Sequence, residues 1–221
     1  MSKALHGSRV AAWNATRSCQ RLALAACGAA CLAGCWQSAP SVMAPSIDAG
    51  SATKQAFELY DANHDGLLDA EELVACPGVL ASLTHYDTNG DRKIDQVEFA
   101  ARMQAWKNSP AMMSVDCRVT LDGRVLAGAE VKYVPEPYLV HWLHEGVGVT
   151  NPDGATGIGI AAEYLPPKLS RVRAMHAGVY KVQITHPTTK IPEVYNTKTT
   201  LGREVSTETK SPFENFVLKS Q

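Results

Sequence analysis

The chain has 221 residues, of which 45% are apolar and 19% are charged, and its formal net charge is −1. This composition allows one or two domains with buried cores, excludes a disordered chain and gives no general case for nucleic-acid binding. The balance hides an asymmetry, because residues 1–34 contain four basic residues and no acidic one. Without that segment the chain keeps 17 basic and 22 acidic residues, a net charge of −5.

The N-terminus has the order of a secretory signal, in which a basic region precedes an apolar region and small residues. The apolar run Leu22–Gly34 has 13 residues, whereas a standard membrane-spanning helix needs about 20. The run leads into Leu-Ala-Gly-Cys at Cys35, which resembles the bacterial lipobox, whose cysteine is lipidated and becomes the first mature residue. Leu-Ala-Ala-Cys at Cys27 also fits but leaves a very short apolar region. We predict a signal peptide over 1–34 and lipidation of Cys35; a signal without lipidation and a chance apolar N-terminus are the alternatives.

Residues 35–52 are rich in Ser, Ala and Pro and have no sustained apolar period, which is typical of a tether. The resemblance to lipoproteins therefore implies an exported protein that is anchored in the bacterial cell envelope, on its periplasmic or surface face. The membrane would be its partner through the N-terminal lipid.

Two twelve-residue segments, Asp61–Glu72 (DANHDGLLDAEE) and Asp87–Glu98 (DTNGDRKIDQVE), each place Asp, Asn, Asp, Asp and Glu at positions 1, 3, 5, 9 and 12. So many carboxylates in one loop repel one another unless a cation neutralises them. Both segments resemble the EF-hand loop, in which position 7 adds a backbone carbonyl and Ca²⁺ takes six to eight oxygens. The resemblance implies two Ca²⁺ sites, with Asp61, Asn63, Asp65, Leu67, Asp69 and Glu72 as ligands of the first and Asp87, Asn89, Asp91, Lys93, Asp95 and Glu98 as ligands of the second.

The flanking residues agree with an EF-hand pair over residues 53–107. Phe57 and Tyr60 are three residues apart before the first loop, and Phe99 and Met103 are four apart after the second, so each pair lies on one helical face. The loops begin only 26 residues apart, and Pro77-Gly78 must break the intervening segment into short helices. This spacing is similar to that of dockerin modules, but the Glu at position 12 and the apolar entering helix favour EF-hands.

Position 6 distinguishes the two loops. It makes a sharp turn that normally takes glycine, and it is Gly66 in the first loop but Arg92 in the second. A residue with a Cβ costs about 1 kcal/mol in such a conformation. Arg92 and Lys93 also bring positive charge to the second loop. We therefore predict that the second Ca²⁺ site is the weaker one. At position 8, Leu68 and Ile94 are expected to join the loops through a short two-stranded ribbon.

The pattern changes to strands beyond residue 113. Residues 115–121 alternate apolar and polar side chains, and Asp122-Gly123 is a hairpin signal. Three stretches, VTLDGRVLAGAEVKYVPEP, TNPDGATGIGI and AGVYKVQI, resemble the carboxypeptidase regulatory-like, transthyretin-like sandwiches of small bacterial lipoproteins. This resemblance implies a small antiparallel β-sandwich over residues 113–221 and a spacer, adhesion or assembly role. None of the residues that such domains share is catalytic.

Other candidates for chemistry are few. His141 and His144 with Glu145 resemble a zinc motif, but the histidines are three residues apart instead of four, which favours a solvated loop. Cys76 and Cys117 would remain after removal of the signal and lipidation of Cys35. The sequence leaves open whether they form a disulfide, and their placement in different modules favours free thiols.

These observations predict an α+β fold with two modules, an EF-hand pair and an antiparallel β-sandwich. The expected protein binds calcium as a constitutive structural ion in the cell envelope, has a structural or adhesive role and is not an enzyme. An envelope protein or polysaccharide would be a further partner. The alternatives are an enzyme or accessory subunit that uses the sandwich, and a calcium sensor, which needs an apolar groove that opens on binding.

Overall fold

The computed structural model describes residues 43–208 and 213–221. The predicted signal peptide, Cys35 and most of the tether lie outside the described residues. Residues Val42–Gln221 form one compact unit, which contains both the helical part and the sheet. Among the described residues, none of the helices has the length and apolar character needed to cross a membrane.

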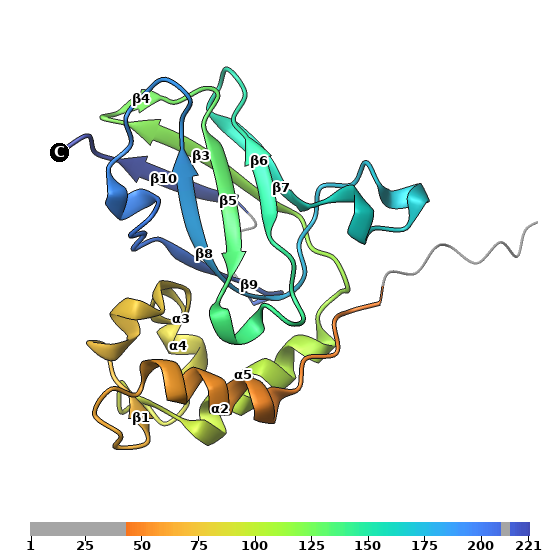
Figure 1. Cartoon of the computed structure of the whole chain (residues 1–221). Helices are drawn as coiled ribbons and strands as arrows, with labels where there is room; N and C mark the ends of the chain where they lie inside the picture. The colour runs from red at the N-terminus through yellow and green to blue at the C-terminus, as the bar shows by residue number, and fades with distance from the viewer. Residues whose placement is uncertain (1–42, 209–212) are drawn as a thin grey trace, which may run out of the picture. The chain divides into compact units, whose positions relative to one another are not determined.

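The helical part precedes the sheet in the chain (Figure 1). Asp48 caps the first helix by accepting hydrogen bonds from the amides of Gly50 and Ser51, and Pro77 occupies the first turn of a later helix, where its missing N–H costs nothing. The elements in order are α2 (Ala49–Tyr60), β1 (Leu67–Leu68), η2 (Glu72–Ala75), α3 (Pro77–Ala81), α4 (Leu83–Tyr86), β2 (Ile94–Asp95), α5 (Gln96–Ala105) and η3 (Trp106–Asn108).

The remaining strands form a single curled sheet in the order β10-β3-β7-β6-β5-β8-β9, with β4 beside β3 (Figure 1). The pairing is antiparallel except between β10 and β3, which run parallel. The strands are β3 (Val115–Leu121), β4 (Arg124–Val125), β5 (Glu130–Pro135), β6 (Gly146–Val149), β7 (Ala155–Ile160), β8 (Gly178–Thr185), β9 (Gly202–Val205) and β10 (Phe213–Leu218), and the short helices between them are η4 (Pro137–Leu139), η5 (Ala162–Tyr164), η6 (Pro167–Leu169) and η7 (Glu193–Tyr195).

The predicted combination of helices with an antiparallel sheet is confirmed, but the predicted separation into two modules is not. The helical part packs on the sheet, and one buried core extends from α2 to β10. The sheet is also continuous instead of being divided into two facing sheets, because β6 pairs with β7 and so joins its two halves.

The start of the sheet follows the sequence pattern closely. In β3 the side chains of Val115, Cys117 and Val119 are buried, as their alternation with polar residues predicts. Asp122 and Gly123 both have positive φ, at 50° and 77°, which is the backbone of a tight hairpin turn between β3 and β4.

A close approach of two backbones joins the helices to the sheet. A Cβ at Gly202 of β9 would lie 2.1 Å from the amide nitrogen of Gly78, and a Cβ at Gly78 would lie 2.4 Å from a methyl group of Val179. Only glycine fits at these two positions. The sequence had indicated Gly78 merely as part of a helix break, whereas its lack of a side chain lets α3 lie directly on β8 and β9.

Candidate metal centre

In the first loop, Asp61–Glu72, backbone amides donate hydrogen bonds to carboxylates of the same loop and so fix its conformation. Gly66 N donates to Asp61 Oδ2 (3.0 Å), and Leu67 N donates to Asp65 Oδ1 (2.9 Å). Glu72 closes the loop, because its Oε1 accepts from the amide of Ala62 (2.9 Å) and its Oε2 accepts from that of Asp69 (3.1 Å). The acidic side chains therefore converge on one backbone frame.

The second loop, Asp87–Glu98, repeats this frame position by position. Arg92 N donates to Asp87 Oδ2 (2.9 Å), and Lys93 N donates to Asp91 Oδ1 (2.8 Å). Glu98 closes the loop by accepting from the amides of Thr88 (2.9 Å) and Asp95 (3.1 Å). Burial opposes ionisation of Glu98, but these backbone hydrogen bonds outweigh it and lower the pKa of the Glu98 carboxyl.

The two loops lie side by side through the predicted ribbon. Strand β1 pairs with β2 in antiparallel register, with Leu68 opposite Ile94 and Leu67 opposite Asp95. Leu68 and Ile94 are fully buried. The prediction that position 8 joins the loops is therefore confirmed.

Each loop contains two residues with positive φ, at positions 4 and 6. They are His64 (60°) and Gly66 (81°) in the first loop, and Gly90 (81°) and Arg92 (64°) in the second. Arg92 thus has the conformation that the sequence argument assigned to it. At position 4 the difference between the loops is reversed, because the first loop has His64 there and the second has Gly90.

One charged contact connects the loops. The ammonium of Lys93, in the second loop, lies 3.5 Å from Oδ2 of Asp65, in the first. The hydrogen bond from the Leu67 amide and the charge of Lys93 hold the pKa of the Asp65 carboxyl below its usual value. The positive charge of Lys93 therefore acts on the first loop as well as on its own, and the prediction that the second site is the weaker one stays a prediction.

The residues of the loops fit a calcium ion in chemistry and in their order along the chain, but their side chains are not gathered around one point. As they stand, no three His, Cys, Asp or Glu side chains within residues 43–208 and 213–221 lie close enough together to hold a metal. The carboxylates and amides are nevertheless the hard oxygen donors that Ca²⁺ takes, in the order that its loops require. Asp61 adds a direct indication, because its Oδ1 is buried without a hydrogen-bond partner among the described residues. A cation would satisfy that oxygen.

An aromatic cluster fixes the helices that hold the loops. Phe57 of α2 and Phe99 of α5 meet edge to face with ring centroids 5.8 Å apart. Tyr138, from η4 of the sheet region, enters between the helices, 5.5 Å from Phe99 and 6.2 Å from Tyr60. Tyr138 is fully buried, so a residue of the sheet region fills the apolar space of the helical part.

Buried polar contacts join the helix next to each loop to the sheet region. Tyr60, which directly precedes the first loop, donates its hydroxyl hydrogen to Glu136 Oε2 (2.8 Å), and burial raises the pKa of the Glu136 carboxyl. On the second-loop side, Arg102 Nε of α5 donates to Glu204 Oε1 of β9 (2.8 Å). Trp106 Nε1 donates to the same oxygen (2.7 Å). We call these contacts the Tyr60 anchor and the Arg102 anchor; sequence analysis missed both, since nothing local marks such distant partners.

The other sequence candidates do not meet in a site. The ring of His144 stacks on Tyr164 with centroids 3.6 Å apart, and Glu145 pairs with Lys132 at 3.7 Å. Cys76 and Cys117 are both buried and free. Burial raises the pKa of the Cys117 thiol to about 12, so it is protonated at neutral pH.

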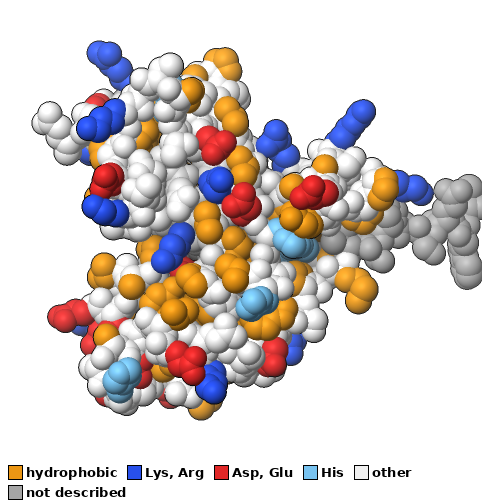
Figure 2. All heavy atoms as spheres, in the orientation of Figure 1, with side chains coloured by type: hydrophobic (Ala, Val, Ile, Leu, Met, Phe, Trp, Pro, Cys, Tyr) orange, Lys and Arg blue, Asp and Glu red, His pale blue; other side chains and the backbone are white. Residues whose placement is uncertain are grey.

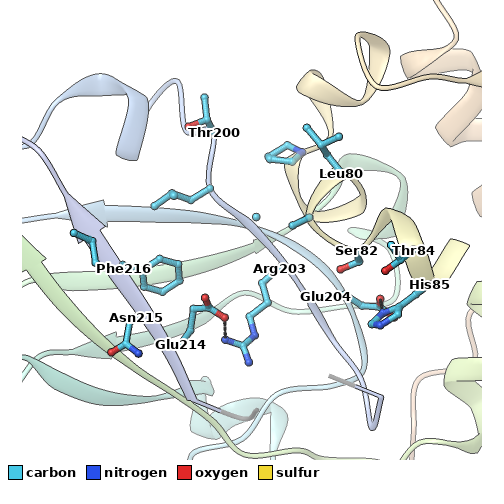
Figure 3. A pocket seen from close by; sticks show the side chains of 15 residues that line it. Leu80, Ser82, Thr84, His85, Thr200, Arg203, Glu204, Glu214, Asn215 and Phe216 are labelled. Carbon is cyan, nitrogen blue, oxygen red and sulfur yellow. Dashed lines mark hydrogen bonds and ion pairs between the residues drawn. The ribbon is translucent and has the colours of Figure 1, made fainter. Parts of the chain in front are cut away.

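A cleft of about 620 Å³ lies between α3, α4 and the edge strands β9 and β10 (Figure 3). Its charged side chains are paired: Arg203 with Glu214 at 2.5 Å, and Glu204 with the buried Arg102. His85 also borders the cleft, 3.2 Å from Glu204 Oε2. The cleft is one candidate location for the enzyme alternative.

No protein-family model matches the chain, and no curated protein and no solved structure is significantly similar to it. The resemblances to EF-hands, to lipoproteins and to transthyretin-like sandwiches therefore depend on the residues of this sequence alone.

Proposed function

We propose that the protein binds two calcium ions in the loops Asp61–Glu72 and Asp87–Glu98, and that these ions fix the helical part onto the sheet. The observation that carries the proposal is the set of matching backbone hydrogen bonds in the two loops, together with Asp61 Oδ1, which is buried and has no hydrogen-bond partner among the described residues. Figure 2 shows acidic side chains exposed over the helical part, where a divalent ion would relieve their repulsion.

A structural ion fits this arrangement better than a signalling ion. A calcium sensor exposes an apolar groove to a target when it binds Ca²⁺. Here Tyr138 of the same chain already packs against the aromatic rings of Tyr60 in α2 and Phe99 in α5, although an open groove remains along the other side of these helices. The Tyr60 and Arg102 anchors hold the helices against the sheet on both sides of that residue.

The location and wider role are part of the proposal. The lipobox-like Leu-Ala-Gly-Cys at Cys35 supports a lipid-anchored protein of the cell envelope. Outside the cytoplasm a calcium module can work with a Kd of about 10⁻⁴–10⁻³ M. The resemblance of residues 113–221 to transthyretin-like domains supports a structural or adhesive role, in which the curled sheet is such a domain with the EF-hand pair docked on it. The second candidate function is that of an enzyme or an enzyme accessory subunit, with its binding site in the cleft beside β9 and β10.

Glu72→Gln and Glu98→Gln test the metal sites directly. Each substitution removes one charged ligand that would bind through both oxygens, so isothermal calorimetry should show at least about tenfold weaker binding at one site, equivalent to about 1.4 kcal/mol. Glu58→Gln, on the exposed face of α2 where it pairs with Lys54, is the matched control. Two unchanged sites in both loop variants, or no heat of binding from the unsubstituted chain, would refute the proposal.

A further inference from the structure

Lys93 belongs to the second loop but contacts the first. In its own loop it stands at position 7, where the backbone carbonyl is the predicted ligand, and its amide donates to Asp91 Oδ1 (2.8 Å). The Nζ atom of its side chain lies 3.5 Å from Oδ2 of Asp65, which stands at position 5 of the first loop. One residue therefore contributes its backbone to one site and its charge to the other.

The ribbon between the loops fixes this contact. Lys93 immediately precedes Ile94, which pairs with Leu68, and both of these side chains are fully buried. The backbone of Lys93 is thus held at a set distance from the first loop. The side chains of Lys93 and Asp65 are each 39% exposed, so the ion pair alone contributes little to folding.

The same contact matters more for a divalent ion. Oδ1 of Asp65 accepts the Leu67 amide and Oδ2 faces Lys93, so both oxygens of this expected ligand have partners. A calcium ion in the first loop must displace the Lys93 ammonium or bind beside it. Because the ion carries two positive charges, its repulsion from Lys93 is twice that between two single charges. At a separation of about 6 Å in water this repulsion corresponds to a tenfold change in affinity or somewhat less after screening by salt.

We propose that Lys93 is a tethered cation that offsets part of the negative charge of the first loop when calcium is absent and lowers its calcium affinity. A residue of the second loop would then determine the calcium concentration at which the first site fills. This inference rests on the proposed calcium function. It predicts two effects of opposite sign. Removal of the charge should strengthen calcium binding at the first site and should lower the stability of the metal-free protein, in which the acidic side chains then repel one another.

The experiment compares Lys93→Gln with Lys107→Gln by calorimetric titration with CaCl₂. Lys107 is exposed on η3, beyond the ten residues of α5 and so about 15 Å further along the helix, and its substitution makes the same change in net charge. With Glu98→Gln present, the second site is weakened, so the tighter binding step reports on the first site, and Lys93→Gln should lower the Kd of that step by about threefold to tenfold. Lys107→Gln should change it by less than about twofold, and Lys93→Arg, which keeps the charge, should restore the original Kd.

Asp65→Asn supplies the second test, because it removes the carboxylate that Lys93 faces. In that background the effect of Lys93→Gln should shrink, whereas a general charge effect would persist. Thermal unfolding in EDTA should show a lower midpoint for Lys93→Gln than for Lys107→Gln, and the same scans check that each variant is folded. If Lys93→Gln weakens binding, or acts no differently from Lys107→Gln, this inference alone is overturned. If the chain without substitutions binds no calcium, the inference and the proposed function both fail.

Discussion

The two loops carry Asp, Asn, Asp, Asp and Glu at the same five positions and share most of their backbone hydrogen bonds, yet they distribute their glycines in opposite ways. The first loop has His64 and Gly66 at its two positive-φ positions, and the second has Gly90 and Arg92. If position 6 alone is used to rank the calcium affinities of the loops, the backbone strain lies in the second loop, which has Arg92 there. The structure places one strained side chain in each loop, so backbone strain alone gives little basis for a difference in affinity, and the charge of Lys93 acts on the first loop.

The largest expected difference between the loops comes from the way each is attached to the sheet. Arg102 and Glu204 are 6% and 2% exposed, so Arg102→Ala removes a buried guanidinium that pairs with a buried carboxylate. Such a loss costs about 3–5 kcal/mol. Tyr60→Phe removes only one hydrogen bond to Glu136 and should cost about 1–3 kcal/mol. Urea unfolding measures both, with Arg118→Ala on the exposed face of β3 as the control. A larger loss for Tyr60→Phe would reverse the assignment of the stronger anchor.

Two variants, His64→Gly and Arg92→Gly, test whether a side chain at a positive-φ position weakens calcium binding by its own loop. Each replaces a side chain at positive φ by the residue that adopts this conformation without steric cost, so each should favour the folded loop by up to about 1 kcal/mol. In calcium calorimetry each variant should bind severalfold more tightly at its own loop. If Arg92→Gly acts and His64→Gly does not, position 6 alone ranks the sites and the second site is the weaker, as the sequence predicts.

The smallest expected difference between the loops lies in the hydrogen bonds to the glutamates at position 12, which are Glu72 and Glu98. Thr88 Oγ1 donates to Glu98 Oε1 (2.9 Å), whereas the first loop has Ala62 at the corresponding position. Thr88→Ala should therefore cost about 0.5–1.5 kcal/mol of stability in EDTA. Ala62→Thr, which offers Glu72 the same hydroxyl, is the reciprocal variant. Thermal midpoints that move in the same direction for both variants would show that this hydroxyl does not distinguish the loops.

Local patterns predicted the loops well, because their geometry depends on neighbouring residues. The pairing of Leu68 with Ile94 and the alternation that begins at Val115 follow from positions close together in the chain. The anchors could not be predicted in this way, since Arg102 and Glu204 are 102 residues apart and neither has a distinctive neighbour. Tyr138 likewise follows a Pro-Glu-Pro segment that indicates only a turn, yet its ring contacts aromatic side chains of both α2 and α5.

This difference also explains why two modules were expected where one unit is found. The composition shift near residue 113 marks a true change from helices to strands. It does not reveal how the two parts pack, because burial of Tyr138 and close contact between Gly78 and Gly202 arise only in the folded chain.

Differential scanning calorimetry with calcium and with EDTA tests the central claim, that two calcium ions hold the helices and the sheet as one unit. Ions that bind only the folded state add about 2.7 kcal/mol for each site at one hundred times its Kd. For a unit of this size, two such sites should raise one shared transition by about 10–20 °C. A calcium-independent midpoint, or a helical transition that separates from that of the sheet in both conditions, would contradict the account.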